Sequence, residues 1–557
     1  MTADVPGPAA ATDDPRDDGP HGDDAHGDDP RGDSPHGGGP RGGGPRDDGA
    51  AVTGRGGARS TAALSGVAAG VVTVGVAALA AALTGAAGDP LVAVGGAFVD
   101  VTPAWLKEWA TGAFGTADKA VLTAGEVVVL LALAALGGLL AARRWSWGAT
   151  LVVVLGAGAG LVALERPGAG ALAWVPSVAG AVAGLLALRA LLRRRPTAGT
   201  LAGTGRRQFL QAAAGATAVG LLALAAGRAL GTAARTATAA RARIRLPRPR
   251  RAAPAPAPGV QVAVPGVEPW VTPPADFYRI DTALVVPQVD PTTWRLRVHG
   301  LVAQEVTLTW DELLAADLVE AWVTLACVSN PVGGDLVGNQ RWLGLPIRDL
   351  LARARPSPDA DMVLSRSVDG FTASTPLEAL TDGRDALLAV GMDGAPLPAE
   401  HGFPVRMVVP GLYGYVSATK WVVDLEVTRF ADATAYWTER GWSERGPVKT
   451  QSRIEVPRRG ARVTAGPVVV AGTAWAQHRG VARVQVRVDD GPWQDAGLAD
   501  DGGIDTWRQW SWTWQAEAGD HELRVRAFDP DGPQTGAVQD VVPDGATGYD
   551  VVRVRVD

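Results

Sequence analysis

Cysteine is almost absent from this chain of 557 residues, in which Cys327 is the single thiol. One cysteine excludes an intrachain disulfide framework and excludes zinc or iron–sulfur sites built from several cysteines. An excess of positive charge is also lacking, because the formal net charge is -6. This charge argues against a nucleic-acid-binding protein held by phosphate contacts. The apolar runs between residues 61 and 235 contain no histidine, so they cannot hold haem between two histidines.

The first 60 residues have too few apolar side chains to fold on their own. They are rich in Gly, Pro and Asp and repeat short motifs such as HGGGP and RGGGP. Burial of apolar surface cannot offset the entropy cost of ordering such a segment, so we predict a disordered tail over 1–60. Its first 50 residues hold 12 Asp against 4 Arg, a formal charge of about -8. His21, His26 and His36 weakly suggest metal binding, but a solvated tail is favoured.

Residues 61–235 predict a membrane region with about five transmembrane helices. A helix needs roughly 20 apolar residues to cross the hydrocarbon layer. Four runs meet this requirement clearly, at 63–86, 120–142, 171–192 and 208–231, and a fifth, 147–164, is shorter but free of charges. They are apolar on all sides rather than amphipathic, which argues against a soluble helical bundle. The stretch 91–106 contains Asp100 and Pro103 and predicts a re-entrant or interfacial piece.

Arginine near the ends of these runs predicts the topology. Arg-rich segments precede the first run and separate runs two and three and runs four and five, whereas the alternate loops are poorer in Arg and Lys. The positive-inside rule then places the N-terminus in the cytoplasm and everything after 235 outside the cell membrane. The basic segment 241–251 opposes this orientation. Arg206-Arg207 before the fifth run resembles a twin-arginine export signal, although an ordinary positive flank explains it equally well.

The remainder of the chain predicts a linker and two soluble domains, so that the whole is multi-domain. Residues 236–269 are rich in Pro, Ala and Arg and predict a semi-rigid extended linker. Residues 270–447 mix short strands with capped helical pieces such as TWDELLAA and predict an α+β domain without βαβ alternation. Residues 448–557 alternate with period two around the turns DDGPW and DPDG, which is typical of an immunoglobulin-like β-sandwich.

Cys327 is the first candidate for chemistry in the α+β domain. It follows the short apolar strand VTLA and precedes the loop VSNPVGG, which predicts a presented rather than a buried thiol. A small core residue is an equally good interpretation of a free cysteine. A nucleophilic thiolate needs a base, and the histidines of this domain are His299 and His401. A soft metal needs only one protein thiolate if an organic cofactor supplies the other sulfurs.

A second group of candidates lies in the segment 393–421. Arginine, lysine, histidine and hydroxyl groups that converge from loops suit a phosphorylated anionic cofactor. These residues are His401, Arg406, Ser417, Thr419 and Lys420. The upstream segment DFYR, residues 276–279, adds Tyr278 and Arg279.

Together these motifs resemble the sulfite oxidase family of molybdopterin enzymes, in particular its membrane-anchored actinobacterial relatives. The segments that carry the resemblance are FYRIDTALVVPQVDPTTWRLRVHG, TLACVSN and MDGAPLPAEHGFPVRMVVPGLYGYVSATKW. It covers about 270–557 and implies a sulfite-oxidase-type molybdopterin domain followed by a dimerisation-type β-sandwich. It also implies a molybdenum ion held by two dithiolene sulfurs of one molybdopterin, by terminal oxygens and by the Cys327 thiolate.

The resemblance assigns roles to the other candidates as well. It implies that Arg279 holds an anionic substrate beside the metal, so that Cys327 and Arg279 are the catalytic residues. The remaining candidates are implied to bind the cofactor. These are Tyr278, Ser367, Asp369, His401, Arg406, Ser417, Thr419 and Lys420.

The implied reaction is oxygen-atom transfer, with electrons leaving to an external carrier or a quinone and with a homodimer formed through the β-sandwich. Two positions depart from the family pattern. Pro331-Val332 stands where animal and plant sulfite oxidases have an arginine pair, and Trp442 stands where they have a substrate-contacting tyrosine. A pocket that lacks these groups leaves the substrate open. We therefore keep a sulfoxide or N-oxide reductase and a cofactor-free membrane receptor or structural protein as alternatives, with a thiol hydrolase the least favoured.

Overall fold

The computed structural model describes residues 48–84, 88–103, 106, 118–166, 169–195, 204–234 and 237–557. The acidic tail up to residue 47, with its three histidines, lies outside the described residues. The chain divides into Met1–Thr53 and a second unit, Gly54–Asp557, which contains the helical region and both soluble domains.

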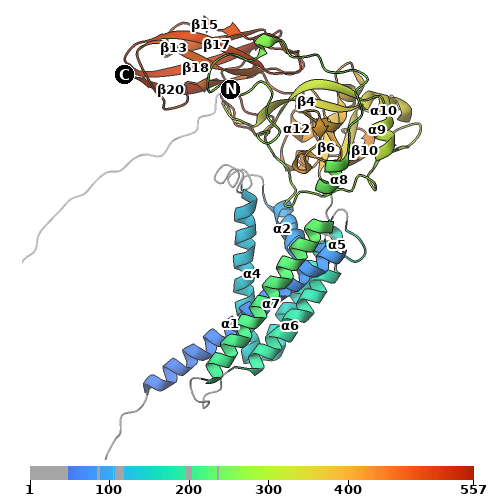
Figure 1. Cartoon of the computed structure of the whole chain (residues 1–557), viewed down its shortest axis with the longest axis vertical. Helices are drawn as coiled ribbons and strands as arrows, with labels where there is room; N and C mark the ends of the chain where they lie inside the picture. The colour runs from blue at the N-terminus through green and yellow to red at the C-terminus, as the bar shows by residue number, and fades with distance from the viewer. Residues whose placement is uncertain are drawn as a thin grey trace, which may run out of the picture. The chain divides into compact units, whose positions relative to one another are not determined.

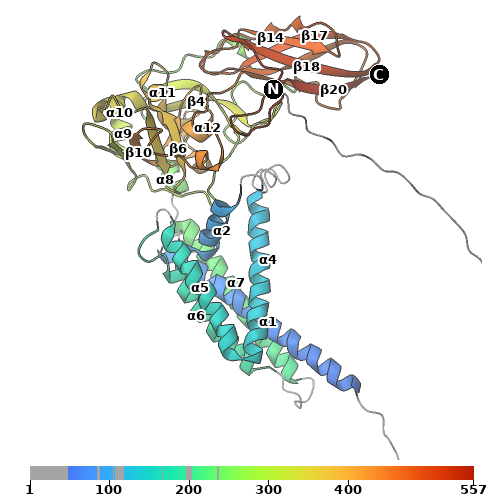
Figure 2. The same cartoon turned by 180° about the vertical axis from the view of Figure 1, so that it is seen from behind.

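The helical region contains long apolar helices (Figures 1 and 2). The helices are α1 (Asp48–Thr84), α2 (Pro90–Val101), α4 (Asp118–Arg143), α5 (Trp145–Glu165), α6 (Val175–Arg193), α7 (Thr204–Ala234) and the short α8 (Ala237–Arg243). Five described segments are long and apolar enough to cross a membrane. These are Ala58–Thr84, Val121–Arg143, Trp145–Glu165, Val175–Arg193 and Thr204–Gly231. The predicted number of five is confirmed by length and composition. Helix α2 covers part of the expected interfacial piece, and its 12 residues reach only about 18 Å, too short to cross.

Small residues allow the long helices to approach one another closely. A Cβ atom on Gly66 of α1 would overlap the carbonyl oxygen of Ala134 in α4, and one on Gly138 of α4 would overlap that of Ala62 in α1. Such glycine contacts are typical of helices that pack in a membrane. Large apolar side chains on the outside of the helices remain exposed, among them Val128, Leu186 and Leu222.

The α+β domain is built on two sheets. One has the strand order β2-β1-β10-β5-β6, with β1 and β10 parallel and the other neighbours antiparallel. Its strands are β1 (Arg295–Gly300), β2 (Val306–Thr309), β5 (Met362–Ser367), β6 (Thr372–Pro376) and β10 (Val422–Thr428). The other has the order β3-β4-β7-β8, with β9 also paired to β7. Its strands are β3 (Val319–Ala326), β4 (Val337–Pro346), β7 (Leu387–Met392), β8 (Ala395–Pro396) and β9 (Arg406–Val408).

Short helices connect these strands. They are α9 (Trp310–Ala315), α10 (Ile347–Ala354), α11 (Leu377–Thr381) and α12 (Gly414–Ser417), with 3₁₀ turns at Pro258–Val260, Ala399–His401 and Thr438–Arg440. Helix α9 begins with a capping box in which Thr309 and Glu312 satisfy each other's backbone N–H groups. The Thr cap predicted from TWDELLAA is thus confirmed.

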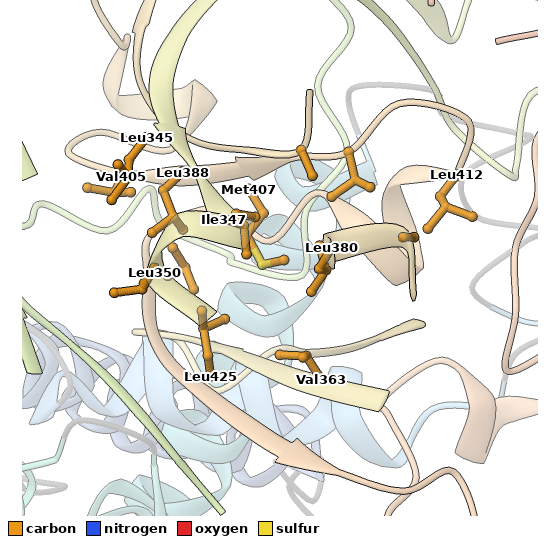
Figure 3. Close-up of a cluster of buried hydrophobic side chains, with 14 of the residues drawn as sticks. Leu345, Ile347, Leu350, Val363, Leu380, Leu388, Val405, Met407, Leu412 and Leu425 are labelled. Atoms are coloured by element: carbon orange, nitrogen blue, oxygen red, sulfur yellow. The ribbon is translucent and has the colours of Figure 1, made fainter. Parts of the chain in front are cut away.

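The core of this domain lies where the two sheets and helix α10 meet (Figure 3). Leu345 and Leu388 come from one sheet and Val363 and Leu425 from the other, and Leu350 of α10 packs with them. All five side chains are buried. This core fixes the strand ends from which the functional side chains extend.

The last domain is a β-sandwich of two antiparallel-rich sheets, which confirms the immunoglobulin-like prediction. The first sheet has the order β11-β13-β17-β16 and the second the order β12-β20-β18-β14-β15, with β19 paired to β18. Trp510 and Trp514 are buried in the core between them, and Trp512 is partly buried there. The strands are β11 (Gln451–Val456), β12 (Arg462–Val463), β13 (Gly466–Trp475), β14 (Arg483–Val488), β15 (Gln494–Asp495), β16 (Gly497–Leu498), β17 (Arg508–Ala516), β18 (Gly519–Asp529), β19 (Gly532–Pro533) and β20 (Asp550–Val556).

The Pro/Ala-rich segment before residue 270 is bound to the α+β domain. The N–H of Arg250 donates to the carbonyl of Leu318 at 2.7 Å, and Arg251 forms a parallel bridge with Val319 at the start of β3. The indole N–H of Trp322 donates to the carbonyl of Pro254 at 2.9 Å. From Arg250 to Pro254 this segment therefore lies on the α+β domain, and further along Gly259 and Val262 form hydrogen bonds with Asp500 and Gln509 of the β-sandwich.

Candidate functional site

One pocket that is open to solvent brings together most of the predicted site residues. Its walls are largely aromatic. The aromatic lining residues are Phe277, Tyr278, Phe371, Tyr415, Trp421, Trp437 and Trp442. Seven of the predicted site residues also line it, namely Cys327, Tyr278, Ser367, Asp369, His401, Arg406 and Lys420. Arg279, Ser417 and Thr419 do not. The mixture of aromatic and polar walls suits an organic cofactor.

Cys327 follows directly on β3 and faces the pocket while being only 8% exposed. The prediction of a presented thiol therefore holds only toward the pocket, because toward bulk solvent the residue is buried. Its N–H donates to the carbonyl of Leu336 at 2.9 Å, and its carbonyl accepts from the N–H of Asn330 at 3.2 Å. Burial raises the pKa of the Cys327 thiol, and hydrogen bonds from Ser329 and the charge of Lys420 partly offset the rise. The hydrogen bonds with Leu336 and Asn330 hold the backbone of Cys327 in place, and metal binding favours the deprotonated form of a cysteine.

Arg406, on β9, is a buried cation that has no carboxylate partner. It is 5% exposed, and its guanidinium donates long hydrogen bonds of 3.3–3.4 Å to the carbonyls of His401, Met407 and Ala418. Among the residues that the structure describes, no carboxylate lies within ion-pair distance of it. Burial lowers its pKa to about 10, so it stays charged at neutral pH. A buried positive charge without a counter-ion favours an anion in the pocket.

His401 is a neutral pocket residue. Its Nε2 lies 3.0 Å from the carbonyl oxygen of Pro274. Because a carbonyl only accepts, Nε2 carries the proton and Nδ1 is left as an acceptor. Burial, together with the charges of Arg406 and Lys420, lowers the pKa of His401 to about 4. The imidazole thus adds no charge and offers one acceptor to a bound group.

Lys420 and Arg279 share one carboxylate, Asp281, which the sequence analysis missed. Lys420 Nζ and Arg279 Nε each lie 2.8 Å from Asp281 Oδ2, and the Asp281 side chain is 3% exposed. Burial lowers the pKa of Lys420 to about 8 although Asp281 opposes this effect. Arg279 is 37% exposed on its side chain, so the structure places it behind Asp281 and not at the pocket surface. A carboxylate two residues after the arginine was the signal available in FYRID.

Within the described part of the chain, two buried hydrogen-bonding atoms of pocket residues have no partner. The hydroxyl of Ser367 and the indole N–H of Trp442 are both inaccessible and unbonded, and both residues line the pocket. Buried polar atoms are nearly always paired in folded proteins, so such atoms at a pocket wall point to a bound group that supplies the partner. Asp369, in contrast, already accepts from Thr282 at 3.3 Å and from the N–H of Phe371 at 3.4 Å.

The hydroxyls of Ser417 and Thr419 form hydrogen bonds within the protein. Ser417 donates to the carbonyls of Tyr413 at 2.9 Å and Leu412 at 3.3 Å, and Thr419 Oγ1 lies 2.7 Å from Ser365 Oγ. Both residues are fully buried beneath the pocket. Their hydroxyls therefore stabilise the connection between α12 and β10. Lys420 and Trp421 lie in this connection.

This arrangement predicts a structural effect for Thr419→Val. The change leaves Ser365 without its hydroxyl partner, and we expect the free energy of unfolding to fall by about 1–3 kcal/mol. We expect cofactor content to stay at the level of the unmodified protein. Urea unfolding of the purified protein measures the first quantity, and molybdenum analysis measures the second. A large loss of molybdenum without loss of stability would instead indicate direct contact with the cofactor.

His299 is not part of the pocket. It lies on β1 and pairs with Asp424 of the neighbouring β10 at 3.0 Å. Of the two histidines considered as a base for Cys327, only His401 lines the same pocket as the thiol, and its Nε2 is already engaged by Pro274.

Comparisons with known proteins match both soluble domains of the chain. A family model described as an oxidoreductase molybdopterin binding domain matches residues 283–437, and one described as a bacterial Ig domain matches residues 451–525. Mitochondrial sulfite oxidase of Mus musculus is 32% identical over 305 residues, which cover 46% of this chain and 55% of that protein. An uncharacterized oxidoreductase of Bacillus subtilis strain 168, YuiH, is 32% identical over 157 residues, which cover 28% of this chain and 76% of that protein.

A further relative is NADH nitrate reductase 1 of Oryza sativa subsp. japonica, which is 32% identical over 182 residues covering 28% of this chain and 20% of that protein. The chain spans about half the length of the sulfite oxidases that it matches. Fold, pocket and matches together define a molybdopterin-binding oxidoreductase domain followed by an Ig-like domain. The chain belongs to the sulfite oxidase family of molybdopterin-dependent oxidoreductases, whose cofactor is molybdenum–molybdopterin.

Proposed function

We propose that this protein is a membrane-anchored enzyme that transfers an oxygen atom to or from a small substrate at a molybdenum ion ligated by Cys327. The observation that carries the proposal is the single thiol of the chain, which lines the same pocket as a buried arginine without a counter-ion. We place the catalytic domain outside the cell membrane, on the arginine distribution around the five apolar helices. A homodimer through the β-sandwich and an external electron carrier or quinone remain part of the proposal.

The residues of the pocket fit the cofactor. Arg406 would face the pterin phosphate, because that group supplies the missing negative charge. His401 would accept a hydrogen bond at Nδ1 from a pterin N–H group, and Ser367 would use its unpartnered hydroxyl. Tyr278, Asp369 and Lys420 complete the lining. When bound, the molybdenum–pterin group supplies the two-electron redox step that the protein's side chains cannot provide.

The protein's own contribution is placement and exclusion of water. Cys327 would bind the metal through its sulfur, after the proton of a thiol with a raised pKa has been displaced by the metal. Aromatic walls from Tyr415, Trp437 and Trp442 restrict the water that reaches the reacting atoms. Arg279 would act through Asp281, which fixes the charged end of Lys420 at 2.8 Å.

A second candidate is reduction of a sulfoxide or N-oxide. The pocket is lined by two cations, Arg406 and Lys420, and by two carboxylates, Asp281 and Asp369, so their charges balance. Many of the other lining residues are aromatic. Once the cofactor phosphate has engaged a cation, little positive charge is left to hold a strongly hydrated anion such as sulfite.

An assay in both directions separates these candidates. We expect purified protein from molybdate-supplied cells to carry molybdenum and pterin in about equimolar amounts. Sulfite oxidation is measured with ferricyanide as acceptor, and reduction of dimethyl sulfoxide or trimethylamine N-oxide with reduced viologen as donor. Faster turnover with sulfite supports the first candidate, and faster turnover with the neutral substrates supports the second. Protein that is free of molybdenum and pterin under these conditions contradicts the proposal.

A further inference from the structure

The loop Cys327–Leu336, which follows the proposed metal ligand, is closed at its base by its own hydrogen bonds. Besides the contacts of Cys327 with Leu336 and Asn330, the N–H of Leu336 donates to Asn330 Oδ1 at 2.9 Å. The tip of the loop has less internal support, with one turn hydrogen bond from the N–H of Gly334 to the carbonyl of Pro331 at 2.9 Å. The position of the tip therefore depends on what packs against it.

The β-sandwich holds this tip. Arg453 on β11 donates from Nη1 to the carbonyl of Gly334 at 2.9 Å. On the other side, Gly333 adopts a φ of 75° and packs so closely on Asp550 of β20 that a Cβ atom would overlap Asp550 Oδ1. Asp550 is itself fixed, because its Oδ2 accepts from the N–H of Ile454 at 2.9 Å. Two strands of the last domain, one from each of its sheets, thus contact two consecutive residues of the loop.

Arg453 is held rigidly by a buried charge network. Its side chain is 4% exposed, and its Nε lies 2.7 Å from Glu455 Oε1. Its Nη2 lies 2.8 Å from Glu268 Oε2 in the segment before the α+β domain, although off the hydrogen-bonding direction. Glu455 also accepts from the Thr473 hydroxyl and from the N–H of Glu268, both at 2.7 Å. A guanidinium fixed by carboxylates has a defined direction in which its remaining N–H groups point.

We propose that Arg453 is a positioning residue for Cys327. The β-sandwich fixes the tip of the cysteine loop through Arg453 and thereby sets the orientation of the thiol and its shielding from solvent. The metal-related part of this inference rests on the proposed function of Cys327 as a molybdenum ligand. A metal ligand needs to be held within about 0.5 Å of its working position by the groups around it, and a loop tip without external contacts opens easily.

The single cysteine gives a direct test. In the full-length protein prepared from molybdate-starved cells, an aromatic disulfide reagent labels only Cys327. We expect Arg453→Lys to raise the labelling rate about tenfold, because an ammonium group cannot contact both glutamates and the Gly334 carbonyl at once. Gly333→Ala displaces the loop tip from Asp550 while Arg453 and its two glutamates remain, and we expect a rise of about the same size. If Arg453→Lys fails to fold, Gly333→Ala still tests whether the β-sandwich fixes the loop tip.

Arg479→Lys is the matched control. Arg479 lies in the same domain, pairs with Asp529 at 2.8 Å and donates to the carbonyl of Val448 at 3.0 Å, but makes no contact with the cysteine loop. We expect this variant to label at the original rate. An unchanged rate in both loop variants, or an equal rise in Arg479→Lys, overturns the proposal.

Spectra and kinetics of the molybdenum-loaded protein test the positioning of Cys327 directly. A purely structural role of Arg453 would not change them. We expect Arg453→Lys to shift the visible absorption of the thiolate–metal bond and to lower kcat more than it changes KM, under conditions in which the variant is folded. An unaltered absorption band in that variant contradicts the positioning of the ligand. Failure of the proposed function is seen separately, as absence of molybdenum from the unmodified protein, and the labelling ratios then still decide whether Arg453 positions the thiol.

Discussion

Cys327→Ser is expected to lower turnover by more than about 100-fold, since changes to groups that merely orient a metal ligand already cost about 10–100-fold. Serine has nearly the same shape, so the pocket should keep its form. Its hydroxyl does not ionise near neutral pH, and oxygen is a poorer ligand than sulfur for a soft metal centre. The variant should therefore keep its pterin through Arg406 and His401 while losing the visible absorption of a thiolate–metal bond.

A graded control for this prediction is Ser329→Ala. The backbone and hydroxyl of Ser329 both hydrogen bond to the Cys327 sulfur and lower its pKa. Without the hydroxyl we expect a smaller loss of turnover, about tenfold, with the absorption band shifted but present. Molybdenum analysis, absorption spectra and turnover of the three proteins are compared. Equal turnover and identical spectra in Cys327→Ser, at unchanged molybdenum content, would falsify the assignment of Cys327 as the ligand.

The sequence was sufficient for the architecture and for the composition of the site. Apolar runs of membrane-spanning length are visible without any structure, because nothing but lipid or a core suits them. The period-two alternation of the last domain likewise leaves little choice of fold. Cys327, His401, Arg406 and Lys420 were grouped from motifs alone, and the structure brings all four to one pocket.

What the sequence could not reveal is which partner each polar side chain takes. Arg279 is predicted at the metal; in the structure it pairs with Asp281, two residues later, and is not among the residues that line the pocket. Thr419 was expected on the cofactor, but the hydroxyl of Ser365 from another strand is its partner. Such choices depend on side-chain directions set by packing, which spacing along the chain does not encode. The contact between Arg453 and the cysteine loop joins residues of two domains. No pattern of neighbouring residues in the sequence predicts such a contact.

Arg406→Met is expected to produce effects of opposite sign on the cofactor-free and cofactor-bound protein. In the cofactor-free protein the lowered pKa of about 10, against an ordinary 12.5, means that burial of the charge costs up to about 3 kcal/mol. The cost is present below pH 10 and fades as the pH rises toward 12.5, because only the charged form is penalised. Methionine removes the charge but also the three long carbonyl contacts. We therefore expect cofactor-free stability to be unchanged or to rise by up to about 2 kcal/mol.

The same substitution is expected to reduce bound molybdenum and pterin at least about tenfold, because a charge-assisted contact with a phosphate is lost in a desolvated site. Arg406→Lys should recover part of the cofactor, since it keeps the charge without the planar fork. Arg384→Met is the matched control. Arg384 is paired with Asp382 at 2.8 Å outside the pocket, so its loss should lower stability and leave cofactor content unchanged. Urea midpoints of the cofactor-free protein measure the change in stability. Metal analysis of the loaded protein measures the change in cofactor content. A destabilised Arg406→Met protein that retains its cofactor contradicts the anion site, because the buried charge would then serve the fold alone.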